Sequence, residues 1–373
     1  MPVKAHPAQA DPAQADPAQA DPAQADPAQA DPAEADPAEA DFATLTDPYR
    51  HELLAYCYRM LGSVDDAEDQ LQETLLRAWR SYQEFEGRSS LRTWLYRIAT
   101  NSCLRALETR SRRPLPSGLG APAPDPDHPL PAGRPEVPWL QPFPDMLITG
   151  SEPADPASIV TSRATMRLAL IAALQYLPAR QRAVLILRDV LGWHAAEVSG
   201  LLGISTAAAN SILQRARARL EQVAPAEDDM REPAEAADRT LLDRYAAAFE
   251  TADVEALTEL LRQDASLEMP PQPYWFAGRD VVARFFRTVV LTGPGKFMLV
   301  PVTANGQPGF AAYARADDGS FQAHAIQVLT IKAGQIARIV SFNDGGLLAA
   351  FGLPFEPAAL PELAACAGCA SIL

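Results

Sequence analysis

The fold of the middle of the chain is decided by the stretch Ala195-Ala-Glu-Val-Ser-Gly-Leu-Leu-Gly-Ile-Ser-Thr-Ala-Ala-Ala-Asn-Ser-Ile-Leu-Gln214. Its apolar residues recur at the spacing of two short crossing helices, with Val198 in the first and Ile212 in the second. Gly203 stands between them, where the turn needs a positive φ, and Ser205 can cap the second helix. The pattern predicts a helix-turn-helix, whose second helix enters the major groove of duplex DNA.

The outward face of the second helix carries polar and basic side chains that suit DNA. Asn and Gln can pair with adenine edges, and Arg can pair with guanine or with phosphates. An ordinary helical hairpin with a solvated Arg face is the alternative interpretation. The predicted DNA-binding residues are Thr206, Asn210, Ser211, Gln214, Arg215 and Arg217.

The charge of the chain is unevenly distributed. It has 373 residues, with 32 Lys plus Arg against 47 Asp plus Glu, so the formal net charge is −15. Residues 87–113, however, hold seven Arg against one acid, which indicates a phosphate-binding surface inside an acidic chain. The sequence has no run of about 18 apolar residues that would predict a membrane span. No secretory signal is visible, and four Cys are too few for a disulfide scaffold. We therefore expect a cytoplasmic protein without contact to a membrane.

Composition divides the chain into a multidomain arrangement. A Pro/Ala repeat at the N-terminus and a segment rich in Pro in the middle have too little apolar content to fold alone. The expected segments are an acidic disordered tail (1–41), a helical domain (42–113), a Pro-rich linker (114–157), the helix-turn-helix domain (158–222), an acidic linker (223–237), an α+β domain (238–356) and a flexible tail (357–373).

The segment 42–113 has the periodicity of a small all-α domain. Helices are expected over 51–61, 64–82 and 91–109. The second is acidic at its N-terminus, and we expect its apolar stripe to face the core; the stripe consists of Leu71, Leu75, Leu76 and Trp79. Cys57 and Cys103 are also expected in the core.

The segment 238–356 changes character from helices to strands. Helices are expected over 239–249, 254–262 and 279–290, followed by an antiparallel meander. The four expected strands are 297–304, 310–315, 321–331 and 335–342. Aromatic residues in the linker usually dock on a folded surface, so Trp139 and Phe143 are expected to pack on this domain.

Three motifs resemble the sigma-70 family in its extracytoplasmic-function (ECF) group. Asp65-Asp-Ala-Glu-Asp-Gln-Leu-Gln-Glu-Thr-Leu-Leu-Arg-Ala-Trp79 resembles the region 2 helix, and Phe85–Cys103 resembles the adjoining promoter-melting segment. Leu177-Pro-Ala-Arg-Gln-Arg-Ala-Val-Leu-Ile-Leu-Arg-Asp189 resembles the opening of region 4. The motifs cover about 41–113 and 158–222, while the C-terminal domain resembles SnoaL-like domains, which are NTF2-type α+β cones.

The resemblance implies partners and roles for the matching residues. Core RNA polymerase would be bound through the clamp coiled coil and the flap of its large subunits, and promoter DNA through a −10 and a −35 element, the latter read by the helix-turn-helix. A solvated acidic face is the alternative for the polymerase-binding helix, and a core position is the alternative for Trp94. The implied polymerase-binding residues are Asp65, Asp66, Asp69, Gln72, Glu73 and Arg77, and the implied −10 residues are Arg88, Arg92, Trp94, Tyr96, Arg97, Asn101 and Arg105.

The C-terminal domain is expected to hold a pocket that could take a small-molecule ligand. Its expected lining is Tyr274, Trp275, Tyr313, His324 and Asp344. A His–Asp pair could act as acid and base, so an enzyme fused to a DNA-binding module is one alternative; a surface pair of Arg338 with Asp344 is another. A repressor that works without polymerase is a third alternative for the whole chain. We expect no catalysis, no cofactor and no metal, because Cys366 and Cys369 supply only two ligands.

Overall fold

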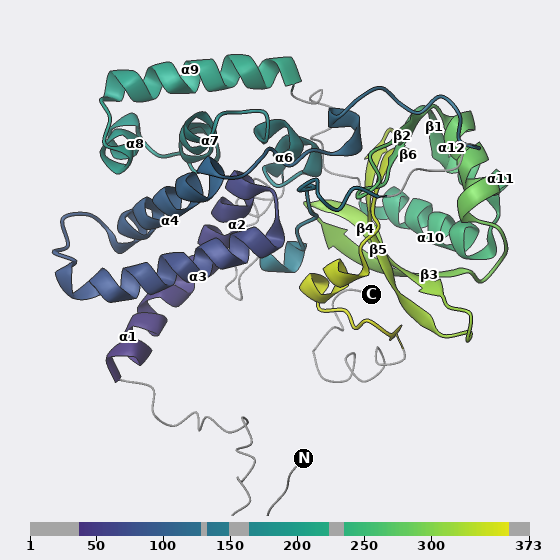
Figure 1. Cartoon of the computed structure of the whole chain (residues 1–373), viewed down its shortest axis with the longest axis horizontal. Helices are drawn as coiled ribbons and strands as arrows, with labels where there is room; N and C mark the ends of the chain where they lie inside the picture. The colour runs from purple at the N-terminus through teal and green to yellow at the C-terminus, as the bar shows by residue number, and fades with distance from the viewer. Residues whose placement is uncertain (1–36, 128–132, 149–163, 224–234, 358–373) are drawn as a thin grey trace, which may run out of the picture.

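The computed structural model describes residues 37–127, 133–148, 164–223 and 235–357. Helices of the N-terminal half lie on one side of a β-sheet, and three helices of the C-terminal part lie on its other side (Figure 1). We call residues 37–108 the first helical domain, 109–127 with 133–148 the connector, 164–223 the second helical domain and 235–357 the C-terminal domain. Cys366, Cys369 and most of the N-terminal repeat lie outside the described residues.

The first helical domain contains the helices that the sequence predicts. Gly62, with φ of 73°, ends α2, and the Ser63 hydroxyl caps α3 by accepting a hydrogen bond from the Asp66 N–H. The repeat was expected to be disordered through residue 41, but α1 begins at Pro37, because proline is tolerated in a first helical turn. The helices are α1 (Pro37–Thr46), the 3₁₀ turn η1 (Asp47–Tyr49), α2 (Arg50–Leu61), α3 (Val64–Ser81), η2 (Tyr82–Glu84) and α4 (Leu91–Glu108).

The second helical domain has the helix-turn-helix in its last two helices. Gly203 has φ of 65° at the end of α8, and the Ser205 hydroxyl accepts a hydrogen bond from the Ala208 N–H at 3.2 Å. The predicted turn and cap are therefore confirmed. The elements are α6 (Leu168–Leu174), α7 (Ala179–Leu185), the π-helical turn η5 (Ile186–Val190), α8 (Ala195–Leu202) and α9 (Thr206–Val223).

The C-terminal domain is an α+β fold with six described strands in the order β2-β1-β6-β5-β4-β3. The four predicted strands are confirmed within a few residues, as β3 (Phe297–Ala304), β4 (Gln307–Arg315), β5 (Phe321–Lys332) and β6 (Gln335–Phe342). The sequence did not predict β1 (Leu261–Glu268), which pairs parallel to β6, or the three-residue β2 (Trp275–Ala277). The helical elements are α10 (Glu235–Thr251), α11 (Val254–Leu260), α12 (Arg279–Phe285), the π-helical turn η7 (Phe286–Val290) and the 3₁₀ segment η8 (Gly345–Phe351).

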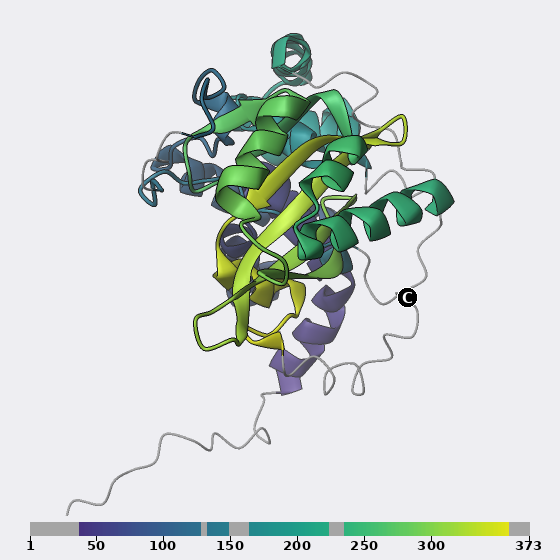
Figure 2. The same cartoon turned by 90° about the vertical axis from the view of Figure 1, so that its right-hand side faces the viewer.

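The two faces of the sheet belong to two different hydrophobic cores. Figure 2 shows α10–α12 in front of the sheet, and aromatic residues such as Phe276 and Phe310 fill the space between them. The opposite face packs on the helical domains and carries Ile326 and Val340 into their core. The sheet thus joins both helical domains and the C-terminal domain into one packed body.

The connector is bound to its neighbours, whereas the sequence suggested a mostly extended tether. The Ala123 N–H donates to the Trp275 carbonyl of β2 at 2.7 Å, and the Gln141 N–H donates to the Gly62 carbonyl at 3.0 Å. Phe143 is fully buried between both sides, so its predicted docking on the C-terminal domain is confirmed. No helix in the described parts of the chain is long and apolar enough to cross a membrane.

Candidate nucleic-acid and polymerase interface

Helix α9 turns its predicted DNA-binding residues to solvent. It lies along the upper edge of the molecule in Figure 1, with its small apolar face, Ala209 and Leu213 among it, buried. One of the exposed residues is already engaged: Arg217 makes a two-pronged ion pair with Asp189, at 2.7 and 2.9 Å. The exposed residues are Thr206, Asn210, Ser211, Gln214, Arg215 and Arg217.

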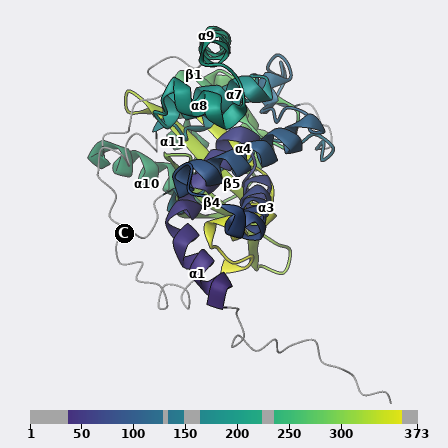
Figure 3. The same cartoon turned by 90° about the vertical axis from the view of Figure 1, so that its left-hand side faces the viewer.

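Helix α4 separates its candidate residues onto two faces. Arg97, Asn101 and Arg105 follow each other at four-residue intervals and are all exposed. Figure 3 shows α4 next to α3 and below α7 and α8. Arg88, in the preceding loop, is exposed and pairs with Glu86. These residues form a basic, solvent-facing strip with one amide in it.

The other face of α4 is covered by the second helical domain. Tyr96 is fully buried and lies edge-on to Trp193, with ring centroids 5.1 Å apart. Burial raises the pKa of Tyr96, which therefore stays neutral. Arg92 binds Glu52 at 2.8 Å and lies 5.7 Å from the Trp193 ring centroid. Tyr96, one of the implied −10 residues, is therefore covered in this conformation, and Arg92 is held in internal contacts.

The half-buried Trp94 lies on neither of these two faces. Its ring packs on Phe85, with centroids 4.8 Å apart, and more distantly on Tyr82, at 6.5 Å. This supports the alternative of a core position for Trp94.

Three of the predicted polymerase-binding residues of helix α3 are exposed to solvent, namely Asp65, Asp69 and Gln72. Glu73 and Arg77 are half-buried and form an ion pair with each other. These five residues remain predictions for the docking surface, because their polar groups reach the surface of the helix.

The prediction that Asp66 belongs to this polymerase-binding surface is wrong. Its carboxylate is buried and forms ion pairs with Arg110 and Arg113 at the start of the connector, so it stabilises the fold and does not face a partner. Two apolar residues of α3, in contrast, are more exposed than expected. Leu76 and Trp79 were expected in the core but are 42% and 40% exposed. The sequence signal for this was weak, because both fit the apolar periodicity of the helix.

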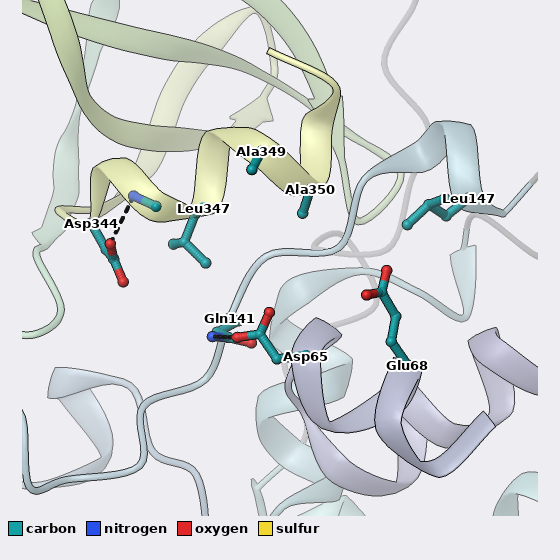
Figure 4. Close-up of a pocket in the computed structure, with 9 residues that line it drawn as sticks. Asp65, Glu68, Gln141, Leu147, Asp344, Leu347, Ala349 and Ala350 are labelled. Atoms are coloured by element: carbon teal, nitrogen blue, oxygen red, sulfur yellow. Dashed lines mark hydrogen bonds between the residues drawn. The ribbon is translucent and has the colours of Figure 1, made fainter. Parts of the chain in front are cut away.

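A cleft of about 520 Å³ lies between α3 and η8 (Figure 4). Asp65 and Glu68 of α3 point into it from one side, and Asp344 and Leu347 lie on the other. Gln141 of the connector also lines the cleft and is bound to α3: its amide nitrogen donates to Asp65 at 2.7 Å, and its oxygen accepts from the Val64 N–H at 3.0 Å. Partial burial, together with Asp65 and Asp69, raises the pKa of Glu68.

The five residues expected to line one pocket of the C-terminal domain are not brought together. Tyr313 lies in the core shared with the helical domains, and its hydroxyl donates to the Pro354 carbonyl at 3.0 Å. Tyr274 packs on the core of the opposite face, where burial raises its pKa to about 12. Trp275 donates through its ring nitrogen to the Gly120 carbonyl at 2.9 Å. The prediction of one pocket is therefore wrong.

The expected His–Asp pair is not formed either. His324 lies exposed beside Phe297, and partial desolvation with nearby Lys296 lowers its pKa. Asp344 caps η8 by accepting from the Gly346 N–H and faces the cleft of Figure 4. The alternative pairing with Arg338 is also wrong, because Arg338 binds the buried Glu268 at 2.8 Å.

Two buried arginines fasten the helical domains to each other. Arg182 of α7 donates to the Met60 carbonyl at the end of α2 and to the Gln175 side chain at 2.9 Å. Arg59 of α2 donates to the Thr165 hydroxyl at 2.9 Å. Burial lowers the pKa of both guanidinium groups to about 10. The hydrogen bonds described for them go to neutral acceptors, so this contact carries a desolvation cost.

Comparison with known proteins agrees with this domain order. Residues 45–113 match the Sigma-70 region 2 family, residues 167–220 match Sigma-70 region 4, and residues 242–339 match the SnoaL-like domain. The ECF RNA polymerase sigma factor SigG of Mycobacterium tuberculosis is 51% identical over 317 residues, which is 84% of each chain. The chain belongs to the ECF RNA polymerase sigma factors.

More distant relatives of this sigma factor share the same layout. SigJ of Mycobacterium tuberculosis is 28% identical over 301 residues, covering 78% of this chain and 88% of the relative. The crystal structure of SigJ superposes with a TM-score of 0.55 at 24% identity and covers 83% of this chain and 98% of that one. This likeness establishes the fold of helical sigma domains followed by a SnoaL-like domain.

Proposed function

We propose that this sigma factor directs core RNA polymerase to promoters through three separate exposed faces. The acidic face of α3 would bind the clamp coiled coil of the polymerase, with Leu76 and Trp79 adding apolar contact area. The second helical domain would contact the flap. The exposed face of α4 would hold the −10 element as a separated strand, and α9 would read the −35 element as duplex.

The observation that carries the proposal is the exposure of the polar faces of α4 and α9 while their apolar faces are buried. On α4, Arg97 and Arg105 suit the phosphates of one strand, and the amide of Asn101 between them can pair with an unstacked base. On α9, Asn210 and Gln214 can read base edges, while Arg215 suits a phosphate. The two helices therefore offer chemistry for two different forms of DNA.

The packed arrangement is a closed conformation in this proposal. The −10 and −35 elements are about 25 base pairs apart, which is about 85 Å of duplex at about 3.4 Å per base pair. The helical domains, in contrast, touch directly through Trp193 and Tyr96. They must separate before both elements can be bound at once.

In this proposal the C-terminal domain holds the two helical domains together and does not act as an enzyme. Its sheet packs on the core of both helical domains, and its expected pocket residues are dispersed over separate surroundings. It would modulate initiation by favouring the closed conformation. The chain would work where the polymerase is, in the cytoplasm.

In-vitro transcription tests the proposal. The full-length protein, added to purified core polymerase and genomic DNA, should give transcripts from a defined set of start sites and should co-purify with the polymerase, which a polymerase-independent repressor need not do. Asn101→Ala should reduce strand opening at these sites. The absence of any site-selective initiation, both with the C-terminal domain and after its removal at residue 234, would refute the proposal.

A further inference from the structure

The turn between β3 and β4 reaches out of the C-terminal domain. It consists of Asn305 and Gly306, with φ values of 58° and 65°. Two consecutive residues with positive φ form the tight turn that suits a right-twisted hairpin, and Asn followed by Gly is the sequence that favours it. The tip, residues 304–307, therefore has a backbone geometry set by its own sequence.

Asn305 contacts every other part of the molecule through one side chain. It is fully buried. The two hydrogens of its amide nitrogen are donated to the Tyr58 hydroxyl of the first helical domain, at 2.9 Å, and to the Met166 carbonyl of the second, at 2.8 Å. Its amide oxygen accepts from the Phe143 N–H of the connector at 2.9 Å, and its own N–H donates to the Phe143 carbonyl at 2.9 Å.

The residues beside Asn305 extend the same junction. The Gly306 N–H donates to the Asp145 carboxylate of the connector at 2.7 Å. The Gln307 amide oxygen accepts from the N–H of Leu168, the first residue of α6, at 3.1 Å. The hairpin tip is thus inserted between the two helical domains and is joined to both by hydrogen bonds.

Building on the proposed function, we propose that the hairpin tip is the latch of the closed conformation and that Asn305 is its positioning residue. Because the side chain of Asn305 forms hydrogen bonds with neutral groups, water can replace these bonds when the tip withdraws. Withdrawal of the tip breaks the bonds to Tyr58 and to Met166 together, so movement of the sheet acts on both helical domains at once. The Tyr58 hydroxyl and the Met166 carbonyl form the surface that the tip recognises.

Two substitutions at Asn305 test the latch without removing the turn. Asn305→Gly keeps a residue that adopts positive φ and removes the carboxamide. Asn305→Asp keeps the shape but offers no hydrogens to Tyr58 and Met166. Tyr58→Phe removes one acceptor from the other side of the contact. Ser320→Gly, in the exposed turn between β4 and β5, is the matched control, because the hydrogen bonds described for Ser320 stay within its own turn, to Asp318 and Ala316.

The measurement is the distance between the helical domains in the full-length protein. Labels are placed by unnatural amino acids at the exposed Gln83 and Gln222. The wild type should show mainly a short distance. Asn305→Gly and Asn305→Asp should raise the ratio of open to closed molecules about tenfold or more, Tyr58→Phe should raise it less, and Ser320→Gly should leave it unchanged.

The outcomes separate the latch from the proposed function. Unchanged distances in both Asn305 variants, with circular dichroism showing a folded protein, would refute the latch even where wild-type transcription is normal. A long-distance population in the variants, together with a higher initiation rate on core polymerase, supports it. A long-distance population without any transcription by wild type or variants would leave the latch standing and refute the sigma function.

Discussion

At the scale of single residues, neighbouring carboxylates of α3 have different tasks. Asp65 and Asp69 are exposed, while Asp66 between them is turned into the domain and bound by Arg110 and Arg113. The family resemblance implies all three for polymerase binding, and their charge is the same. Their burial depends on where the chain returns after α4, some 45 residues later, which helical periodicity does not reveal.

This difference gives a prediction for Asp66 and Asp69. Asp66→Ala leaves the half-buried Arg113 and the more exposed Arg110 without their shared carboxylate and should lower the free energy of unfolding by about 2 kcal/mol. Asp69→Ala should leave stability within about 0.5 kcal/mol but weaken binding to core polymerase. Denaturant unfolding and polymerase pull-down measure the two effects. Equal loss of stability in both variants would contradict this assignment.

At the scale of elements, the sequence predicted the helices well and their faces less well. Caps such as Ser63 and Gly203 are local signals, so the bounds of α3 and α8 follow from them. The exposure of Trp79 and the burial of Tyr96 depend on which neighbour packs on each face. The strand β1 was missed because its pairing with β6 joins segments about 70 residues apart, and no local pattern encodes such a pair.

On helix α9, residues that recognise bases and residues that bind phosphates should contribute differently to DNA binding. Arg215→Ala should weaken duplex binding for all sequences and reduce the salt dependence by about one counterion. Asn210→Ala should instead relax the preference at one base pair, at a cost of about 1–3 kcal/mol for the preferred sequence. Fluorescence anisotropy on −35 duplexes at several salt concentrations measures both. Two variants with the same salt slope and the same sequence preference would argue against separate roles.

At the scale of the whole molecule, the closed packing was the least predictable feature. The shared core draws residues from α2, the connector, α7 and the sheet, and each of these segments also fits an independent domain by composition. The connector has the proline content of a free tether, yet its backbone hydrogen-bonds to Trp275 and Gly62. Such contacts depend on matching surfaces that only the assembled fold brings together.

Trp193 provides the last prediction, because it touches α4 directly and lies in a different domain from Asn305. Trp193→Leu keeps apolar volume in its own domain but loses the edge-on contact with Tyr96 and the contact with Arg92, worth about 1–2 kcal/mol together. Separation of the domains uncovers Tyr96 and Arg92, which lie beside the exposed strip of α4. The free protein should then bind a single-stranded −10 oligonucleotide several-fold more tightly, as measured by anisotropy. Both Trp193→Leu and Asn305→Gly bias the same equilibrium between closed and open forms. The affinity of the double variant should therefore level off at that of the fully open protein. Weaker binding by a folded Trp193→Leu variant, or a double variant without a plateau, would mean that the second helical domain does not cover the Tyr96 face of α4 in solution.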